Sequence, residues 1–319
     1  MVNSNLGAMS LVEQAKVEYE RERMLEVHRL LEDVDPETTC DPVWVERAKR
    51  EAGDAAKLYA VLREGGGVTS SEEWRLAVDS GGIAVRSRPE ATARFASVCV
   101  SLDLAASLSL VMTVVNEVSL LPSWMPEFLG FEARCIKQVS RFRQLVWIRV
   151  KLPFPFAPRD VVFDAMGVDV LDRPEPCILI VVRTPDPKDW PDVEIDAPKD
   201  RRDGRAVRAR VLVAGAFVKP KSSTSSAFCN VVNIDPHLDF LPGWLFNWVN
   251  RRLVWYAFDA FRGKVAAVQE AGLSPEYQEF VAKKSNIYDE MHRRLRPWEG
   301  GACVRGGGNC NGARHPTTL

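Results

Sequence analysis

The sequence VKLPFPFAPRD, residues 150–160, joins two runs of β-branched and aromatic residues that have the pattern of strands. It holds three prolines, and proline fixes φ and removes a backbone donor. The segment is therefore expected to be a stiff loop that leaves the sheet. Its phenylalanines, Phe154 and Phe156, either pack beneath the loop or project as a tip that touches a membrane, and the sequence leaves both open.

A second informative stretch is LPGWLFNWVNRRL, residues 241–253, which opens a long helix expected over 241–270. Leu245 and Val249 belong to one apolar stripe, whereas Trp244 and Trp248 lie off it. A helix with so wide an apolar arc covers one layer and meets something else on its other side. An ordinary core helix between two layers would show the same pattern.

Outward from these stretches, helices and strands follow an order typical of the α+β class. Short connections between strands exclude the repeated helical crossovers of a parallel sheet, so the sheet is expected to be antiparallel. Helices are predicted over 11–34, 42–63, 103–116, 241–270 and 275–296. Strands are predicted near 74–78, 82–87, 92–102, 131–140, 143–152, 160–171, 177–184, 206–218 and 226–235.

Composition excludes several classes of function. The net charge of −1 provides no global field for nucleic acid, and no apolar run reaches the ~18–20 residues that span a bilayer. Seven scattered cysteines and an N-terminus without a secretory signal favour reduced thiols and a cytoplasmic location. The four histidines lack a partner at metal-ligand spacing, and neither a phosphate loop nor a nucleophile elbow is present. We therefore expect no enzyme activity, cofactor or metal.

Three segments together resemble the START domain family. They are EEWRLAVDSGGIAVRSRP at 72–89, VKLPFPFAPRDVVF at 150–163 and LPGWLFNWVNRR at 241–252, in the family's order. The resemblance implies a helix-grip fold, in which a curved antiparallel β-sheet wraps around a long C-terminal helix and leaves a tunnel for one lipid. The expected organisation is an N-terminal helical extension, 1–67, a START-like domain, 68–271, a C-terminal helix, 272–298, and a disordered tail, 299–319.

Strand alternation, combined with the resemblance, assigns the tunnel wall. The expected ligand-binding residues are Val146, Ile148, Val150, Phe163, Ala165, Val181, Leu212, Ala214, Phe228, Asn230, Val232, Leu245 and Val249. The expected gate, which also makes transient peripheral contact with a membrane, consists of Pro153, Phe154, Pro155, Phe156, Trp244 and Trp248. Asn230 either contacts a hydroxyl or carbonyl of the ligand or is a buried amide satisfied by backbone.

The polar anchors of known relatives are missing at the matching positions. Relatives that carry phospholipid or ceramide place an arginine three residues before a tryptophan, whereas Leu121 precedes Trp124 here. Cholesterol carriers use an acid–arginine pair at positions that match Val146 and Ala165. A wall without charges favours a sterol, fatty acyl or isoprenoid ligand over a phospholipid. The alternative is a ligand-free scaffold with a filled core, which binds a protein partner through helices 11–34 or 275–296.

Overall fold

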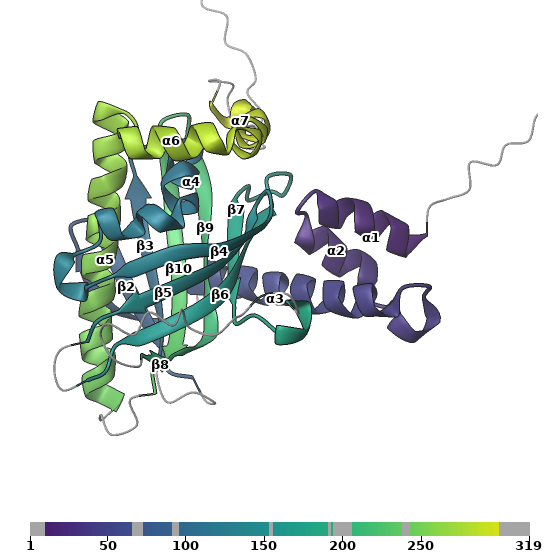
Figure 1. Ribbon diagram of the computed structural model, residues 1–319, viewed down its shortest axis with the longest axis horizontal. Helices are drawn as coiled ribbons and strands as arrows, with labels where there is room; N and C mark the ends of the chain where they lie inside the picture. Colours follow the sequence, from purple (N-terminus) through teal and green to yellow (C-terminus); the bar gives the residue numbers. More distant parts are fainter. Residues whose placement is uncertain are drawn as a thin grey trace, which may run out of the picture.

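A curved, ten-stranded sheet forms the centre of the computed structural model, which describes residues 10–65, 73–90, 96–152, 156–190, 193, 206–237 and 243–299 (Figure 1). The strands are β1 (Arg75–Ser80), β2 (Ile83–Arg88), β3 (Ser97–Leu104), β4 (Glu132–Ser140), β5 (Arg143–Val150), β6 (Arg159–Asp169), β7 (Ile178–Arg183), β8 (Val207–Arg208), β9 (Arg210–Ser222) and β10 (Ser225–Asp235). They are arranged in the order β1-β2-β3-β10-β9-β7-β6-β5-β4, with every neighbouring pair antiparallel, and β8 pairs in parallel with β6.

The inner face of this sheet is covered by the long helix α5 (Gly243–Ala271) and the short helix α4 (Leu108–Asn116). Helix α5 packs on β2 and β3 and also contacts α4 (Figure 1). The aromatic side chains of Phe258 and Phe261 lie 5.7 and 5.0 Å from the ring of Phe228 on β10. The architecture is the α+β helix-grip fold that the sequence predicted. No helix within the described ranges is both long and apolar enough to cross a bilayer.

Helix α3 (Pro42–Gly65) covers part of the outer face, and the two helices before it extend this layer, with α2 (Met24–Leu31) packed on α3 and α1 (Leu11–Glu20) packed on α2. A capping box between Ser10 and Glu13 starts α1. The single helix predicted over 11–34 is wrong, because Glu22 has a φ of +58° and separates α1 from α2. Helix α3, which the sequence predicted, packs across β7, β9, β10 and β3 (Figure 1).

The C-terminal helices also differ from the prediction. The helix expected over 275–296 is divided into α6 (Pro275–Lys283) and α7 (Ser285–Glu299), because Lys284 leaves helical geometry with φ −116° and ψ 32°. Both helices lie near α4 at one end of the sheet (Figure 1). The helix expected from 103 begins only at Leu108, since β3 continues to Leu104 and Ser107 caps α4. The expected tail beyond 299 lies outside the described residues.

The backbone of β9 approaches α3 too closely for a side chain at Gly215. A Cβ atom there would lie 2.3 Å from Cδ2 of Leu58 on α3 and 2.4 Å from the carbonyl oxygen of Ile180. Leu58 and Leu62 pack in one apolar cluster with outward residues of the sheet, among them Leu179 and Phe217. Gly215 therefore sets how closely the N-terminal extension lies against the outer face.

Buried charges join the same two layers beside this contact. Nη2 of Arg143 on β5 lies 2.9 Å from Oε1 of Glu51 on α3 and 2.6 Å from Oδ2 of Asp164 on β6. Arg183 contacts the same two carboxylates, at 2.5 and 2.8 Å, and both carboxylate side chains are fully buried. Burial alone would raise the pKa of Glu51, but Arg143 and Arg183 hold the pKa below its usual value. The cluster therefore stabilises a charged Glu51 at neutral pH.

Substitution of Gly215 by alanine is expected to lower the free energy of unfolding by about 1–3 kcal/mol, because Leu58 and Ile180 must shift. The matched control is Gly53→Ala in α3, where nothing lies within 4 Å of the added Cβ. The free energy of unfolding of that variant should rise by about 0.5–1 kcal/mol, because alanine loses less backbone conformational freedom than glycine when it enters a helix. Denaturation in urea measures both, and a neutral Gly215→Ala would contradict the close approach.

Glu51→Gln is expected to lower the free energy of unfolding by about 3–5 kcal/mol at pH 7, because two arginines lose a buried carboxylate. The pKa of Glu51 is lower in the folded than in the unfolded protein, where it is about 4.3. The charged carboxylate therefore stabilises the fold at any pH above the unfolded pKa, and this stabilisation is lost as the pH falls through the folded pKa. The difference in free energy of unfolding between Glu51→Gln and the wild type should therefore become smaller below about pH 4. Exposed Glu46→Gln is the control, and equal stability of Glu51→Gln and wild type at pH 7 would refute the cluster's role.

Candidate ligand cavity

The two faces of β6 are buried unequally. Its even-numbered residues, among them Val162, Asp164 and Met166, face the N-terminal side of the sheet and are buried. Its odd-numbered residues, among them Phe163 and Ala165, face α4 and α5 and are only half-buried. Strand β7 shows the same alternation. Along β6 and β7 the inner face is thus the less densely covered one, whereas inward residues of β2 and β3 such as Ile83 and Val100 are fully buried against the helices.

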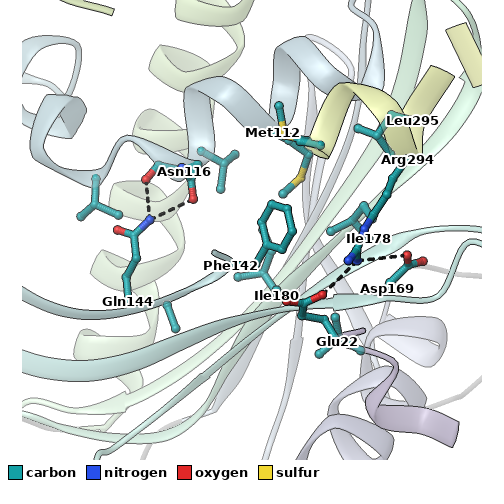
Figure 2. Close-up of a pocket in the computed structure, with 16 residues that line it drawn as sticks. Glu22, Met112, Asn116, Phe142, Gln144, Asp169, Ile178, Ile180, Arg294 and Leu295 are labelled. Carbon is teal, nitrogen blue, oxygen red and sulfur yellow. Dashed lines mark hydrogen bonds and ion pairs between the residues drawn. The ribbon is translucent and has the colours of Figure 1, made fainter. Parts of the chain in front are cut away.

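Part of this free space is a cavity of about 90 Å³ between the sheet, α4 and α7 (Figure 2). Apolar side chains form most of its wall. Those from the helices are Met112 and Val115 on α4 and Met291 and Leu295 on α7, and those from the sheet side include Phe142, Ala165, Ile178 and Ile180. A space of this size has room for several water molecules but not for a lipid.

One end of the cavity is polar and is closed by both terminal extensions. Nη1 of Arg294 on α7 lies 2.9 Å from Oε2 of Glu22, in the turn between α1 and α2, and 3.6 Å from Oδ2 of Asp169 on β6 (Figure 2). The backbone N–H of Asp169 also donates to the carbonyl oxygen of Glu22, at 2.8 Å. Burial raises the pKa of Glu22, although Arg294 acts in the opposite direction. These contacts fix the N-terminal turn against β6 and α7.

The other polar group in the wall is Gln144 on β5. Its Nε2 donates to the carbonyl oxygen and to Oδ1 of Asn116, at 3.1 and 2.9 Å. Nδ2 of Asn116 donates to the hydroxyl of Tyr288, whose own hydroxyl donates to Glu117. Burial and the hydrogen bond to Glu117 raise the pKa of Tyr288, so this phenol stays protonated. Lys284 completes the network through an ion pair with Glu117, at 2.9 Å.

Gln144 was missing from the predicted site, although the sequence contained a signal for it. It shares the strand parity of Val146 and Ile148, and it pairs directly with Ala165 on the inner face. A polar residue at the start of an otherwise apolar inward series indicates a specific contact. Its partners on α4 and α7 are distant in the sequence, so the network itself could not be inferred from spacing.

Most predicted wall residues on strands share the inner face. The registers place Val146 opposite Phe163, Ala165 opposite Gln144, and Asn230 opposite Ala216. Of the predicted residues, the inner face holds Val146, Ile148, Val150, Phe163, Ala165, Ala214, Phe228, Asn230 and Val232. Ala165 also lines the cavity. Nδ2 of Asn230 donates to the carbonyl oxygen of Gly215 at 2.9 Å, so backbone satisfies at least this side of the amide.

The inward assignment of Val181 is wrong. Asp164 pairs with Arg183 and Gly167 with Ile180, so Ile178, Ile180 and Val182 face inward while Val181 packs in the outer cluster with α3. The assignment of Leu212 also fails, because the register of β9 with β10 shifts at this residue and leaves its side chain 39% exposed.

The expected gate lies largely outside the described residues. Pro153, Phe154 and Pro155 are not described, and neither are the side chains of Trp244, Leu245, Trp248 and Val249 within α5. Phe156 is described and half-buried. Within the described ranges, no group of at least three His, Cys, Asp or Glu side chains is placed to hold a metal ion.

A curved antiparallel sheet packed on a long C-terminal helix defines a helix-grip protein, and here an apolar cavity lies between the sheet, α4 and α7. Residues 66–274 match the family model described as the START domain, and the chain therefore belongs to the START domain family. Membership supports lipid binding in general. Helices α1–α3 precede the matched range and α6 and α7 follow it. Met291, Arg294 and Leu295 of the cavity wall thus come from outside the family domain.

Solved structures with the same fold share little sequence with this chain. Human STARD10 has a TM-score of 0.55 and 16% identity, over 76% of this chain and 89% of that one. Human StAR-related lipid transfer protein 5 has a TM-score of 0.57 and 15% identity, over 70% of this chain and 98% of that one. These likenesses show the fold alone. No curated protein matches the sequence.

Proposed function

We propose that the protein binds one lipid-like molecule between α5 and the inner face of the sheet, and transfers it between membranes. The observation that carries the proposal is the sparse covering of the inner face along β6 and β7. Phe163 and Ala165 on β6 are half-buried, whereas the outward residues beside them are buried, Val162 against Trp147 and Trp190 and Met166 in the cluster with α3. In a START domain, free apolar surface facing the long helix is the natural place for an apolar ligand.

The volume of the cavity limits how the ligand is held. The cavity volume of about 90 Å³ is below the ~300–1,000 Å³ of typical small-molecule sites. Ile148, Val150 and Val161 continue the half-buried inner surface along β5 and β6. We therefore infer that the cavity is one end of a longer site, which widens along these strands when a ligand enters.

The chemistry of the wall supports a weakly polar ligand. Val146 is fully buried, and Ala165 lines the cavity where cholesterol carriers are expected to have a charged pair. We propose a sterol, fatty acyl or isoprenoid ligand, and a gate formed by residues 153–156 with Trp244 and Trp248. The chain would act in the cytoplasm as a carrier without catalytic activity, through transient contact with membranes. Residues 68–271 would form the carrier unit.

Native mass spectrometry of the full chain, followed by lipid extraction, tests binding directly. We expect one molecule of a sterol, fatty acyl or isoprenoid species per chain. A bound phospholipid would retain the carrier function and refute the argument from the missing anchors. An empty protein that takes up nothing from vesicles of mixed lipid composition would overturn the proposal.

Ile148→Glu is expected to reduce lipid uptake at least tenfold, because it places a charge on the inner apolar surface. The matched control is Leu76→Glu on β1, where the native side chain is 57% exposed and a carboxylate remains in water. Uptake from labelled vesicles is measured for both variants, with circular dichroism to verify folding. Unchanged uptake by a folded Ile148→Glu variant would contradict the inner-face assignment.

A second candidate function is a ligand-free scaffold, and the small volume of the cavity favours it. Its partner would bind the outward surfaces of the terminal helices. Helices α1–α3 already bury one side in a common apolar cluster with the sheet, and α7 buries Tyr288, Met291 and Leu295, so only their remaining faces are available. A protein that stays empty in both lipid experiments would make this the better account.

A further inference from the structure

We propose that Gln144 selects ligands whose polar end is a hydrogen-bond donor, such as the hydroxyl of a lipid alcohol. The inference rests on the proposed lipid-binding function and specifies the polar end of its ligand. It assigns to this residue a role that neither the sequence motifs nor the family match provides.

The observation behind it is a buried acceptor at the cavity wall. Gln144 is only 4% exposed and lines the cavity. Within the part of the chain that the structure describes, Oε1 of Gln144 has no hydrogen-bond partner. Figure 2 shows its amide nitrogen turned toward Asn116 and its oxygen turned away. A buried carbonyl oxygen without a donor is costly, so a donor is expected at this position.

The identity of the free atom follows from the neighbouring hydrogen bonds. Nε2 of Gln144 donates to two oxygens of Asn116, so a reversed amide would place oxygen against oxygen. Asn116 is fixed in turn, because its Nδ2 donates to the hydroxyl of Tyr288. Tyr288 donates to Glu117, which is paired with Lys284. The carboxylate of Glu117 can only accept, so it fixes the direction of every hydrogen bond in this network. The atom left at its end is Oε1 of Gln144, which is an acceptor.

An acceptor discriminates among lipids by the chemistry of their polar ends. A hydroxyl or an N–H can donate to Oε1, whereas a carboxylate, phosphate, ether or ketone offers only acceptors. An ionised ligand would in addition bring a charge into an apolar wall. Lys284 and Tyr288 lie after the matched range 66–274, so this selectivity depends on the helices that follow the family domain.

The test compares three ligands that share one alkyl chain: 1-dodecanol, 1-methoxydodecane and dodecanoate. Isothermal titration calorimetry with the full chain is expected to show about tenfold tighter binding of the alcohol than of the ether, and the weakest binding for dodecanoate. In Gln144→Leu, the affinity for the alcohol should fall to that for the ether, while the ether binds as before. Gln278→Leu, on the exposed side of α6, is the matched control and should keep the tenfold preference.

Equal affinities for alcohol and ether in the wild type would overturn the inference and leave lipid binding intact. Preferential binding of dodecanoate would overturn it as well, in favour of an anionic ligand. If none of the three binds and the purified protein carries no lipid, the proposed function fails together with the inference. If Gln144→Leu does not fold, the alcohol and ether affinities are compared in the wild type and in the unbranched Gln144→Met variant, and these decide whether the inference holds.

Discussion

The two faces of the sheet are covered to different extents along β6 and β7, and the rest of this structure depends on that difference. Side chains alternate across a strand, so β5, β6 and β7 each present one set of residues to the outer face, on which α3 packs, and another to the inner face, on which α4 and α5 pack. The outward set is sealed by the contact of Leu58 with Gly215 and by the charges around Glu51. With the outer layer closed in this way, the inner face can remain incompletely filled while the sheet stays rigid.

Both terminal extensions contribute to this arrangement, although they flank the family domain. Helix α3 packs on the outer face, and the turn at Glu22 between α1 and α2 reaches the end of the cavity, where it meets Arg294 of α7. Helix α7 also provides apolar wall residues and holds Gln144 in place through Tyr288 and Asn116. A domain limited to the matched residues would lack the Glu22–Arg294 contact and the wall residues from α7. The extensions therefore shape the cavity as much as the sheet does.

The sequence predicted the fold class and the inner face of β5, because that strand alternates clearly between Val146 or Ile148 and charged or aromatic neighbours. It failed for β7, whose residues are apolar on both faces from Cys177 to Val182, so that alternation gave no reason to prefer Ile180 over Val181. The helix breaks at Glu22 and Lys284 carry neither glycine nor proline and were therefore missed. The pairing of Glu51 with Arg143 joins residues far apart in the chain, which no local pattern reveals.

The most direct test of the two-sided sheet is methyl NMR of the isotope-labelled protein with a spin-labelled long-chain alcohol as the probe. The account predicts that the probe broadens the methyl signals of Ile148, Ile178 and Ile180 on the inner face. The signals of Leu179 and Val181, on the outer face of the same sheet, should be broadened clearly less than those of their inward neighbours. Equal broadening on both faces, or broadening confined to the outer set, would contradict the claim that the ligand lies between the sheet and α5.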